Sequence, residues 1–266
     1  MTLAPLPSTS PAKGTVPIAA VVFDTFGTVC DFYHPMKRAF EDFMASRGLS
    51  ADAGAMAIDW RTAYIFSAFS QASEESEFRS LREINSHNLV AVLDNHLGIT
   101  ASDAELAELT TVWERLDPWP DAVEGLTRIK DLAIIAPLSN ANFADMVRLS
   151  RYAGLPWDIV LGSSISGFYK PHPATYLESV AALGLEPGQV CMVAAHQADL
   201  AFAAGHGMQT AFVKRPDEFG GPVKPADPEP GVSYIAAAEV HVEGDWTYVA
   251  EDFLDLAEQL SGQARK

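Results

Sequence analysis

Basic residues are scarce in this 266-residue chain. Lys and Arg together number 18 against 35 Asp and Glu, which gives a formal net charge of −17. Such a surface repels nucleic acid and anionic membranes, so neither is expected as a partner. An anionic substrate would need positive charge supplied locally by its binding site.

Cysteines and long apolar runs are also few. The two cysteines, Cys30 and Cys191, both lie in apolar stretches, so neither a disulfide framework nor a zinc site is expected. No apolar run approaches the roughly 20 residues that a membrane-spanning helix needs. Residues 1–15 are rich in Pro, Ser and Thr and lack an apolar core, which predicts a flexible leader rather than a secretion signal. We therefore expect a soluble, cytoplasmic protein.

Three short apolar runs each end in polar or small residues. They cover residues 17–23, 132–138 and 190–194, and the polar side chains that follow include Asp24, Ser139, Asn140 and His196. Runs without polar alternation are typical of strands buried on both faces, as in a parallel sheet. Residues 158–161 and 210–213 are shorter candidates for further strands.

Helical patterns alternate with these strands after residue 119, at residues 120–132, 142–153 and 172–184. Alternation of this kind favours a doubly wound α/β domain with a Rossmann-like parallel sheet. Ligands bind beyond the carboxyl ends of the strands in such sheets, which is where Asp24, Ser139, Asn140 and His196 would lie.

Residues 33–118 interrupt the alternation. Their pattern is almost entirely helical, at residues 35–47, 53–71, 78–97 and 103–116, which predicts an inserted all-helical cap directly after the first strand. The expected division is a leader at 1–15, a core at 16–32 and 119–262, and a cap at 33–118. Residues 215–230, rich in proline, are expected to form a surface loop.

Asp24 follows the first predicted strand in the segment Asp24-Thr25-Phe26-Gly27-Thr28. An aspartate there, with Gly27 for a tight turn and Thr28 to bind the carboxylate, is a candidate covalent nucleophile. The alternative is an Asp that merely caps a loop.

In this segment and three others the chain resembles the haloacid dehalogenase superfamily, over nearly its whole length. The other matches are Ser139 at the end of the second strand, Lys170 within Tyr-Lys-Pro, and Asp199 after the third strand. The resemblance implies a hydrolase that uses Asp24 as its nucleophile.

Phosphatases of this superfamily carry a second Asp two residues after the nucleophile, where this chain has Phe26. Phe26 cannot protonate a leaving alcohol, and Asp24 with Asp199 alone is a poor ligand set for Mg²⁺. We therefore expect metal-independent chemistry without a cofactor.

The remaining residues resemble the type II (S)-2-haloacid dehalogenases. The resemblance implies that Asp24 attacks C2 of a short 2-haloalkanoic acid and expels halide, and that water then hydrolyses the aspartyl ester to a 2-hydroxy acid. It also implies a homodimer and a preference for the (S) enantiomer.

The same resemblance assigns roles to the other candidates. Arg61 would bind the departing halide with help from the Asn140 amide, Ser139 and the amides near Thr25 and Phe26 would hold the substrate carboxylate, and Lys170 would orient Asp24. Tyr176, six residues after Lys170, is a further substrate-binding candidate; packing in the core is its alternative.

The chain departs from the commonest dehalogenase pattern at Ala194 and His196, where Ser and Asn usually stand. An imidazole with a pKa near 6.5 suits the deprotonation of water. We hypothesise that His196, oriented by Asp199, is the general base of ester hydrolysis. The alternative is a hydrogen-bonding spacer that replaces Asn.

Three other functions stay open at this point. A phosphatase with altered acid chemistry would need Mg²⁺, and a catalytically silent binding protein would have no need of Asp24, Thr28 and Lys170 together. A phosphonate-cleaving enzyme would need an imine-forming lysine in the cap, where Lys37 is the only lysine between residues 33 and 118.

Overall fold

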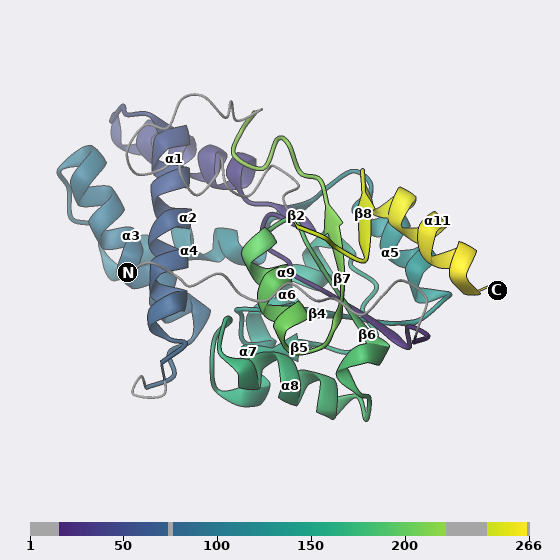
Figure 1. Cartoon of the computed structure of the whole chain (residues 1–266). Coiled ribbons are helices and arrows are strands. Elements are labelled where there is room, and N and C mark those ends of the chain that lie inside the picture. The colour runs from purple at the N-terminus through teal and green to yellow at the C-terminus, as the bar shows by residue number, and fades with distance from the viewer. Residues whose placement is uncertain (1–15, 74–76, 222–243, 265–266) are drawn as a thin grey trace.

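The computed structural model describes residues 16–73, 77–221 and 244–264 (Figure 1). The predicted leader, residues 1–15, lies outside the described residues, as does most of the predicted loop at 215–230. No helix of the described chain is long and apolar enough to cross a membrane.

A six-stranded sheet with the order β5-β4-β1-β6-β7-β8 forms the centre of the fold. All of its strand pairs are parallel. The strands are β1 (Ala20–Phe23), β4 (Ile134–Ser139), β5 (Leu161–Gly162), β6 (Val190–Ala194), β7 (Gln209–Val213) and β8 (Tyr248–Ala250). The chain runs outward from β1 to one edge and then returns to build the other. The carboxyl end of β1 is therefore a point where the strand order reverses, as in the expected doubly wound fold.

Helices cover both faces of this sheet. Val21 and Phe23 of β1 pack in one apolar cluster with side chains of α5 (Ala122–Lys130), α6 (Phe143–Ala153) and α11 (Phe253–Ala264). Ala20 and Val22, which point the opposite way, pack with α8 (Pro173–Ala182) and α9 (Gln197–Gly205). Alternate residues of one strand thus serve two apolar layers, which explains the unbroken apolar run in the sequence.

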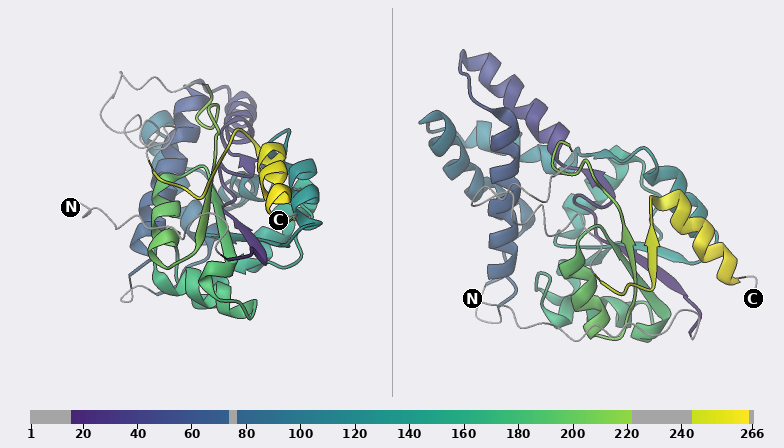
Figure 2. Two further views of the ribbon diagram at one scale, coloured as in Figure 1. Left: turned by 45° about the vertical axis from the view of Figure 1, so that its right-hand side comes forward. Right: turned by 45° about the horizontal axis from the view of Figure 1, so that its top comes forward.

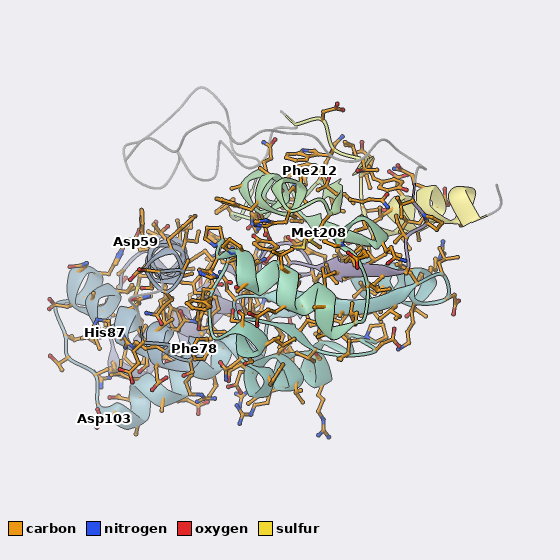
Figure 3. The ribbon with its side chains drawn as sticks, turned by 60° about the horizontal axis from the view of Figure 1, so that its bottom comes forward. Asp59, Phe78, His87, Asp103, Met208 and Phe212 are labelled. Atoms are coloured by element: carbon orange, nitrogen blue, oxygen red, sulfur yellow. The ribbon has the colours of Figure 1, made fainter. Side chains whose placement is uncertain are left out.

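Four helices, α1 (Tyr33–Arg47), α2 (Ala53–Ser70), α3 (Leu81–Leu97) and α4 (Asp103–Thr110), follow the first strand. A 3₁₀ helix, η1 (Thr111–Glu114), continues α4. We call these five elements the helical insertion. The insertion stands beside the sheet, at the left of Figure 1, and the right panel of Figure 2 shows it projecting from the sheet-containing part. In Figure 3, Asp59, His87 and Asp103 lie in this half, and Met208 and Phe212 lie in the other.

Local sequence explains where the insertion helices begin and end. Asp52 accepts hydrogen bonds from the first amides of α2, and Ser80 and Ser102 form capping boxes with Glu83 and Glu105. Gly48 and Gly98 end α1 and α3 in the left-handed conformation.

A two-stranded antiparallel ribbon closes the base of the insertion. It pairs β2 (Cys30–Asp31) with β3 (Asp117–Pro118), so the chain leaves and re-enters the sheet-containing part at neighbouring points. The predicted boundaries between core and cap, at residues 33 and 118, lie beside this ribbon. The division of the chain into these two domains stays a prediction.

Several short elements escaped sequence analysis. These are β2, β3, β8, α9, α7 (Ser163–Ser166) and η2 (Pro187–Gln189). The predicted surface loop is wrong at Arg215 and Glu218, which are buried, whereas Pro216 and Asp217 between them are exposed. Cys30 and Cys191 are buried free thiols, as their apolar surroundings predicted.

Candidate active site

Asp24 lies one residue past the end of β1, between the ends of β4 and β6. Its backbone amide donates to the carbonyl of Val193 in β6 (2.9 Å), which extends the sheet register by one residue. The next residues turn sharply, with Gly27 at a φ of 91°. Asp24 is 7% exposed. The carboxylate therefore lies beyond the carboxyl ends of the strands, where this fold class binds ligands.

Three side chains bind the Asp24 carboxylate. Lys170 donates from Nζ to Oδ1 (3.0 Å), and Thr28 donates from its hydroxyl to Oδ2 (2.9 Å). His196 Nδ1 lies 3.0 Å from the same Oδ2. Thr28 also accepts the backbone amide of Ala195 (2.9 Å), which ties the turn after β1 to the end of β6.

Lys170 links Asp24 to a second carboxylate. Its ammonium also donates to Asp199 Oδ2, while the Tyr176 hydroxyl donates to Asp199 Oδ1 (2.7 Å). Tyr176 is fully buried, so it belongs both to the core and to this hydrogen-bond network. The ammonium thus occupies the space between the two carboxylates.

The charges in this cluster shift one another's pKa values. Burial alone would raise the pKa of Asp24, but Lys170 and His196 outweigh it and hold the pKa well below its usual range. Burial would lower the pKa of Lys170, but Asp199 and Asp24 raise it above its ordinary value. Burial raises the pKa of Asp199 against the opposing effect of Lys170. Asp24 is therefore an ionised carboxylate, as a nucleophile must be.

His196 does not have the surroundings that the sequence predicted. Its Nε2 lies 2.8 Å from Glu218 Oε1, whereas the carboxylate of Asp199 is bound by Lys170 and Tyr176. The expectation that Asp199 orients His196 is therefore wrong. Burial would lower the pKa of His196, but Glu218 and Asp24 raise it well above its ordinary value near 6.5. The two carboxylates therefore favour the protonated form of the ring, the imidazolium.

The polar residues at the end of β4 contact one another and Lys170. Ser139 donates its hydroxyl hydrogen to Thr25 (2.7 Å), and both side chains are buried. The Asn140 amide accepts from the backbone amide of Lys170 (2.6 Å) and donates to its carbonyl (3.3 Å). Asn140 therefore positions Lys170, and the predicted assistance to halide binding would fall to the second hydrogen of its Nδ2.

Arg61 of α2 reaches from the helical insertion to the turn that follows Asp24. Its Nη2 donates to the carbonyl of Phe26 (3.1 Å), and its guanidinium carbon lies 5.3 Å from the ring centre of Phe32 and 5.0 Å from that of Tyr64. Arg61 is 6% exposed, and its Nε has no hydrogen-bond partner among the described residues. A buried donor of this kind suits an anionic ligand.

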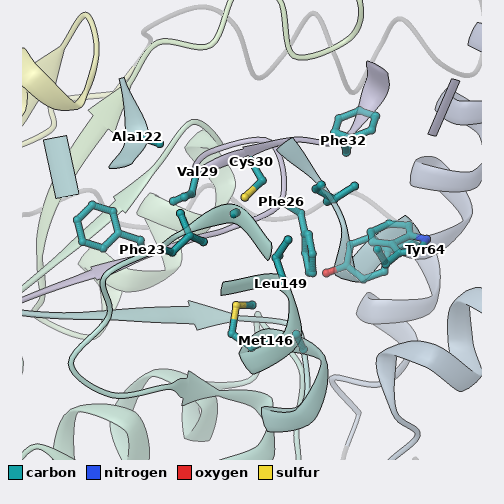
Figure 4. Packing of buried hydrophobic residues seen from close by; sticks show 14 of the residues in the cluster. Phe23, Phe26, Val29, Cys30, Phe32, Tyr64, Ala122, Met146 and Leu149 are labelled. Atoms are coloured by element: carbon teal, nitrogen blue, oxygen red, sulfur yellow. The ribbon is translucent and has the colours of Figure 1, made fainter. Parts of the chain in front are cut away.

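Phe26 forms an apolar wall beside this guanidinium. Its ring meets Tyr64 and Trp113 edge to face, with centroids 5.9 and 5.3 Å away. Figure 4 shows Phe26 between the core residues and Tyr64. Trp113, from the 3₁₀ helix η1, was not expected at the site. Its position depends on how the helices of the insertion fold back toward the sheet, and no local sequence motif predicts this.

Lys37 of α1 has a half-exposed side chain. Its ammonium pairs with Glu41 on the exposed part of α1 (3.5 Å). An exposed lysine that is paired in this way does not favour a phosphonate-cleaving enzyme.

Comparison with known proteins agrees with this geometry. Residues 18–207 match the model of the haloacid dehalogenase-like hydrolase family. The (S)-2-haloacid dehalogenase 4A of Burkholderia cepacia is 26% identical over 214 residues, which cover 74% of this chain and 84% of that protein. The (S)-2-haloacid dehalogenase of Xanthobacter autotrophicus is 28% identical over 209 residues, 74% of this chain and 76% of that protein.

A solved structure is more similar still. A defluorinating L-2-haloacid dehalogenase is 40% identical, with a TM-score of 0.83 over 92% of this chain and 95% of that one. The family match covers most of the sheet and the whole insertion, and the structural overlap extends over nearly all of the chain. The chain belongs to the haloacid dehalogenase-like hydrolase family.

Proposed function

We propose that this protein is an (S)-2-haloacid dehalogenase that works without a metal ion and uses Asp24 as its covalent nucleophile. The observation that carries the proposal is the buried Asp24 carboxylate, held ionised by the Lys170 ammonium beside the apolar wall of Phe26. Because Lys170 binds both Asp24 and Asp199, these two carboxylates already share one cation. The names of the related dehalogenases point to the same reaction.

In the first half-reaction, a carboxylate oxygen of Asp24 attacks C2 of the haloacid and the carbon–halogen bond breaks. The electron pair leaves with the halide, and an ester forms between Asp24 and the substrate. Arg61 would receive the halide, because its buried guanidinium combines a positive charge with an Nε that no described residue binds. Desolvated donors stabilise developing negative charge far better than donors in water.

In the second half-reaction, water attacks Cγ of the Asp24 ester and loses one proton to His196 Nδ1, the ring nitrogen that faces Asp24. The added hydroxyl passes its hydrogen to the departing alkoxide, so the 2-hydroxy acid leaves and the Asp24 carboxylate returns. Esterification removes the negative charge of Asp24, which lowers the pKa of His196 and allows the ring to lose its resting proton first. One proton reaches solvent per turnover.

The remaining residues support these steps. Thr28 and Lys170 would hold Asp24 in position, and Asp199 with Tyr176 would hold Lys170. The substrate carboxylate would bind near Ser139 and the amides after Asp24, in exchange for the bond between Ser139 and Thr25. The helical insertion would act as a cap over this site. A cytoplasmic homodimer completes the proposal.

Halide release from chloroacetate, with a chelator present, tests this function. Chloride release without added metal is the expected result, alongside no hydrolysis of a generic phosphate ester. Phosphate release that depends on Mg²⁺, without chloride release, would instead identify a phosphatase. Binding of 2-haloacid without either product would identify a silent binding protein.

A further inference from the structure

A buried carboxylate outside every motif of the sequence contacts the candidate site. Glu218 lies in the turn after β7 and is 1% exposed, although this stretch was expected at the surface. A buried carboxylate requires partners, because its charged form is costly to remove from water. Its partner is the Nε2 atom of His196, 2.8 Å from Oε1.

Arg215 fixes the backbone that carries Glu218. Arg215 is 8% exposed, donates from Nε to the carbonyl of Thr28 (2.8 Å) and binds Asp121 through both terminal nitrogens (2.9 Å each). The Glu218 amide then donates to the Arg215 carbonyl (3.1 Å). The turn after β7 is thereby tied to the turn after β1, so Glu218 is held relative to Asp24.

The neighbours of Glu218 leave space for its carboxylate. A Cβ atom added to Gly27 would lie 2.0 Å from Glu218 Oε1, so a larger residue there would displace this carboxylate. The adjacent Phe219 packs edge to face on Phe32, with ring centroids 5.6 Å apart. Phe32 immediately precedes α1, so this turn also contacts the start of the helical insertion.

His196 thus lies between two carboxylates, with Asp24 at Nδ1 and Glu218 at Nε2. A ring that is held at both nitrogens has a fixed orientation, with Nδ1 toward Asp24. Esterification neutralises only Asp24. Glu218 then remains to balance the positive charge that the ring gains from the hydrolytic water.

We infer that Glu218 is a positioning residue for ester hydrolysis, which holds His196 with Nδ1 toward Asp24 and balances the imidazolium formed when water is deprotonated. This inference rests on the proposed function. Glu218 has no role in the first half-reaction, in which Asp24 displaces the halide. Its loss should therefore slow the second half-reaction selectively.

The test compares wild type, Glu218→Gln and Asp217→Asn during one and many turnovers of chloroacetate. Asp217 is the exposed neighbour of Glu218, so its substitution makes the same charge change outside the site. For Glu218→Gln we expect a stoichiometric burst of chloride, accumulation of the Asp24 ester in the mass spectrum, and a steady-state rate reduced by at least about 10-fold. Asp217→Asn should match wild type.

A pH profile separates this role from simple support of the fold. The charged groups that contact the ring among the described residues are Asp24 and Glu218, and Lys170 binds the other oxygen of Asp24. Removal of the Glu218 charge makes the imidazolium less stable, so the rise of kcat with pH should move to lower pH in Glu218→Gln. Glu218→Asp, which keeps the charge, should restore the inflection toward wild type.

The outcomes distinguish a failure of the proposed dehalogenase function from a failure of the inference about Glu218. If wild type releases no halide, the proposed function fails. If wild type turns over and Glu218→Gln shows neither ester accumulation nor a shifted inflection, the inference about Glu218 alone is overturned. A folded Glu218→Gln protein that loses the chloride burst would also overturn it, because Glu218 would then act before the ester forms.

Discussion

The guanidinium of Arg61 donates a hydrogen bond to the carbonyl of Phe26, two residues after the nucleophile (3.1 Å). This contact joins a helix of the insertion to the turn that follows the first strand. The Nε of Arg61, which has no hydrogen-bond partner among the described residues, therefore belongs to a side chain that is already anchored beside Asp24.

Substitution Arg61→Lys should reduce kcat/KM for chloride release by about 10- to 100-fold, since hydrogen bonds to charged groups contribute about 1.5–3 kcal/mol. Lysine keeps the charge, but it cannot both bind the Phe26 carbonyl and offer a second, rigidly placed donor to the halide. Arg115→Lys is the matched control, because Arg115 pairs with Glu108 on the exposed surface. An unchanged kcat/KM in Arg61→Lys would refute the halide-binding role.

Substitution Gly27→Ala should reproduce the kinetics of Glu218→Gln. Its Cβ would collide with Glu218 Oε1, so the carboxylate must move away from His196. The positive φ adds a backbone cost of about 1 kcal/mol. Gly48→Ala is the control, because Gly48 has a φ of 64° and open space around it, so it carries the backbone cost alone.

Ester trapping and urea denaturation together check this prediction. Both alanine variants should lose stability, and only Gly27→Ala should accumulate the ester. Accumulation in neither variant would mean that Glu218 keeps its contact or does not need it.

Asp145→Asn should stabilise the protein at pH 7.5. Burial and the nearby Glu114 raise the pKa of Asp145 to about 6, while Arg82 and Arg148 act against them. A raised acid pKa favours the folded state at low pH, and this contribution is lost as the pH rises through about 6. Above that pH the ionised carboxylate is a cost, which the amide would relieve by about 1–3 kcal/mol.

The measurement is the melting temperature of wild type and variant at pH 4 and pH 7.5. The gain should be clear at pH 7.5 and small at pH 4, where the wild-type carboxyl is protonated. An equal gain at both pH values would show that ionisation of Asp145 is not the cause. Asp217→Asn, an exposed change of the same kind, should show neither gain.

The sequence predicted the parts of the fold and site that are encoded locally. Unbroken apolar runs located β1, β4 and β6, and the residues after them placed Asp24 and His196 at one edge of the sheet. Short elements such as β2, β3 and β8 were missed, because strands of two or three residues produce no periodicity.

Glu218 and Trp113 escaped prediction for a different reason. Each reaches the site through contacts between segments distant in sequence, and the proline-rich surroundings of Glu218 are those of an ordinary surface turn. Asn140 was predicted at the site, but its contacts with the backbone of Lys170 are visible only in the structure. The pKa of His196 could likewise not be judged without Glu218.

One measurement tests the covalent ester most directly. A single turnover of (S)-2-chloropropionate by excess enzyme in H₂¹⁸O, followed by mass spectrometry, reports where the solvent oxygen goes. If Asp24 is the nucleophile and water attacks its Cγ, ¹⁸O enters the Asp24 carboxyl and the first product carries none. Appearance of ¹⁸O in the product hydroxyl during that first turnover, with none in Asp24, would contradict the mechanism.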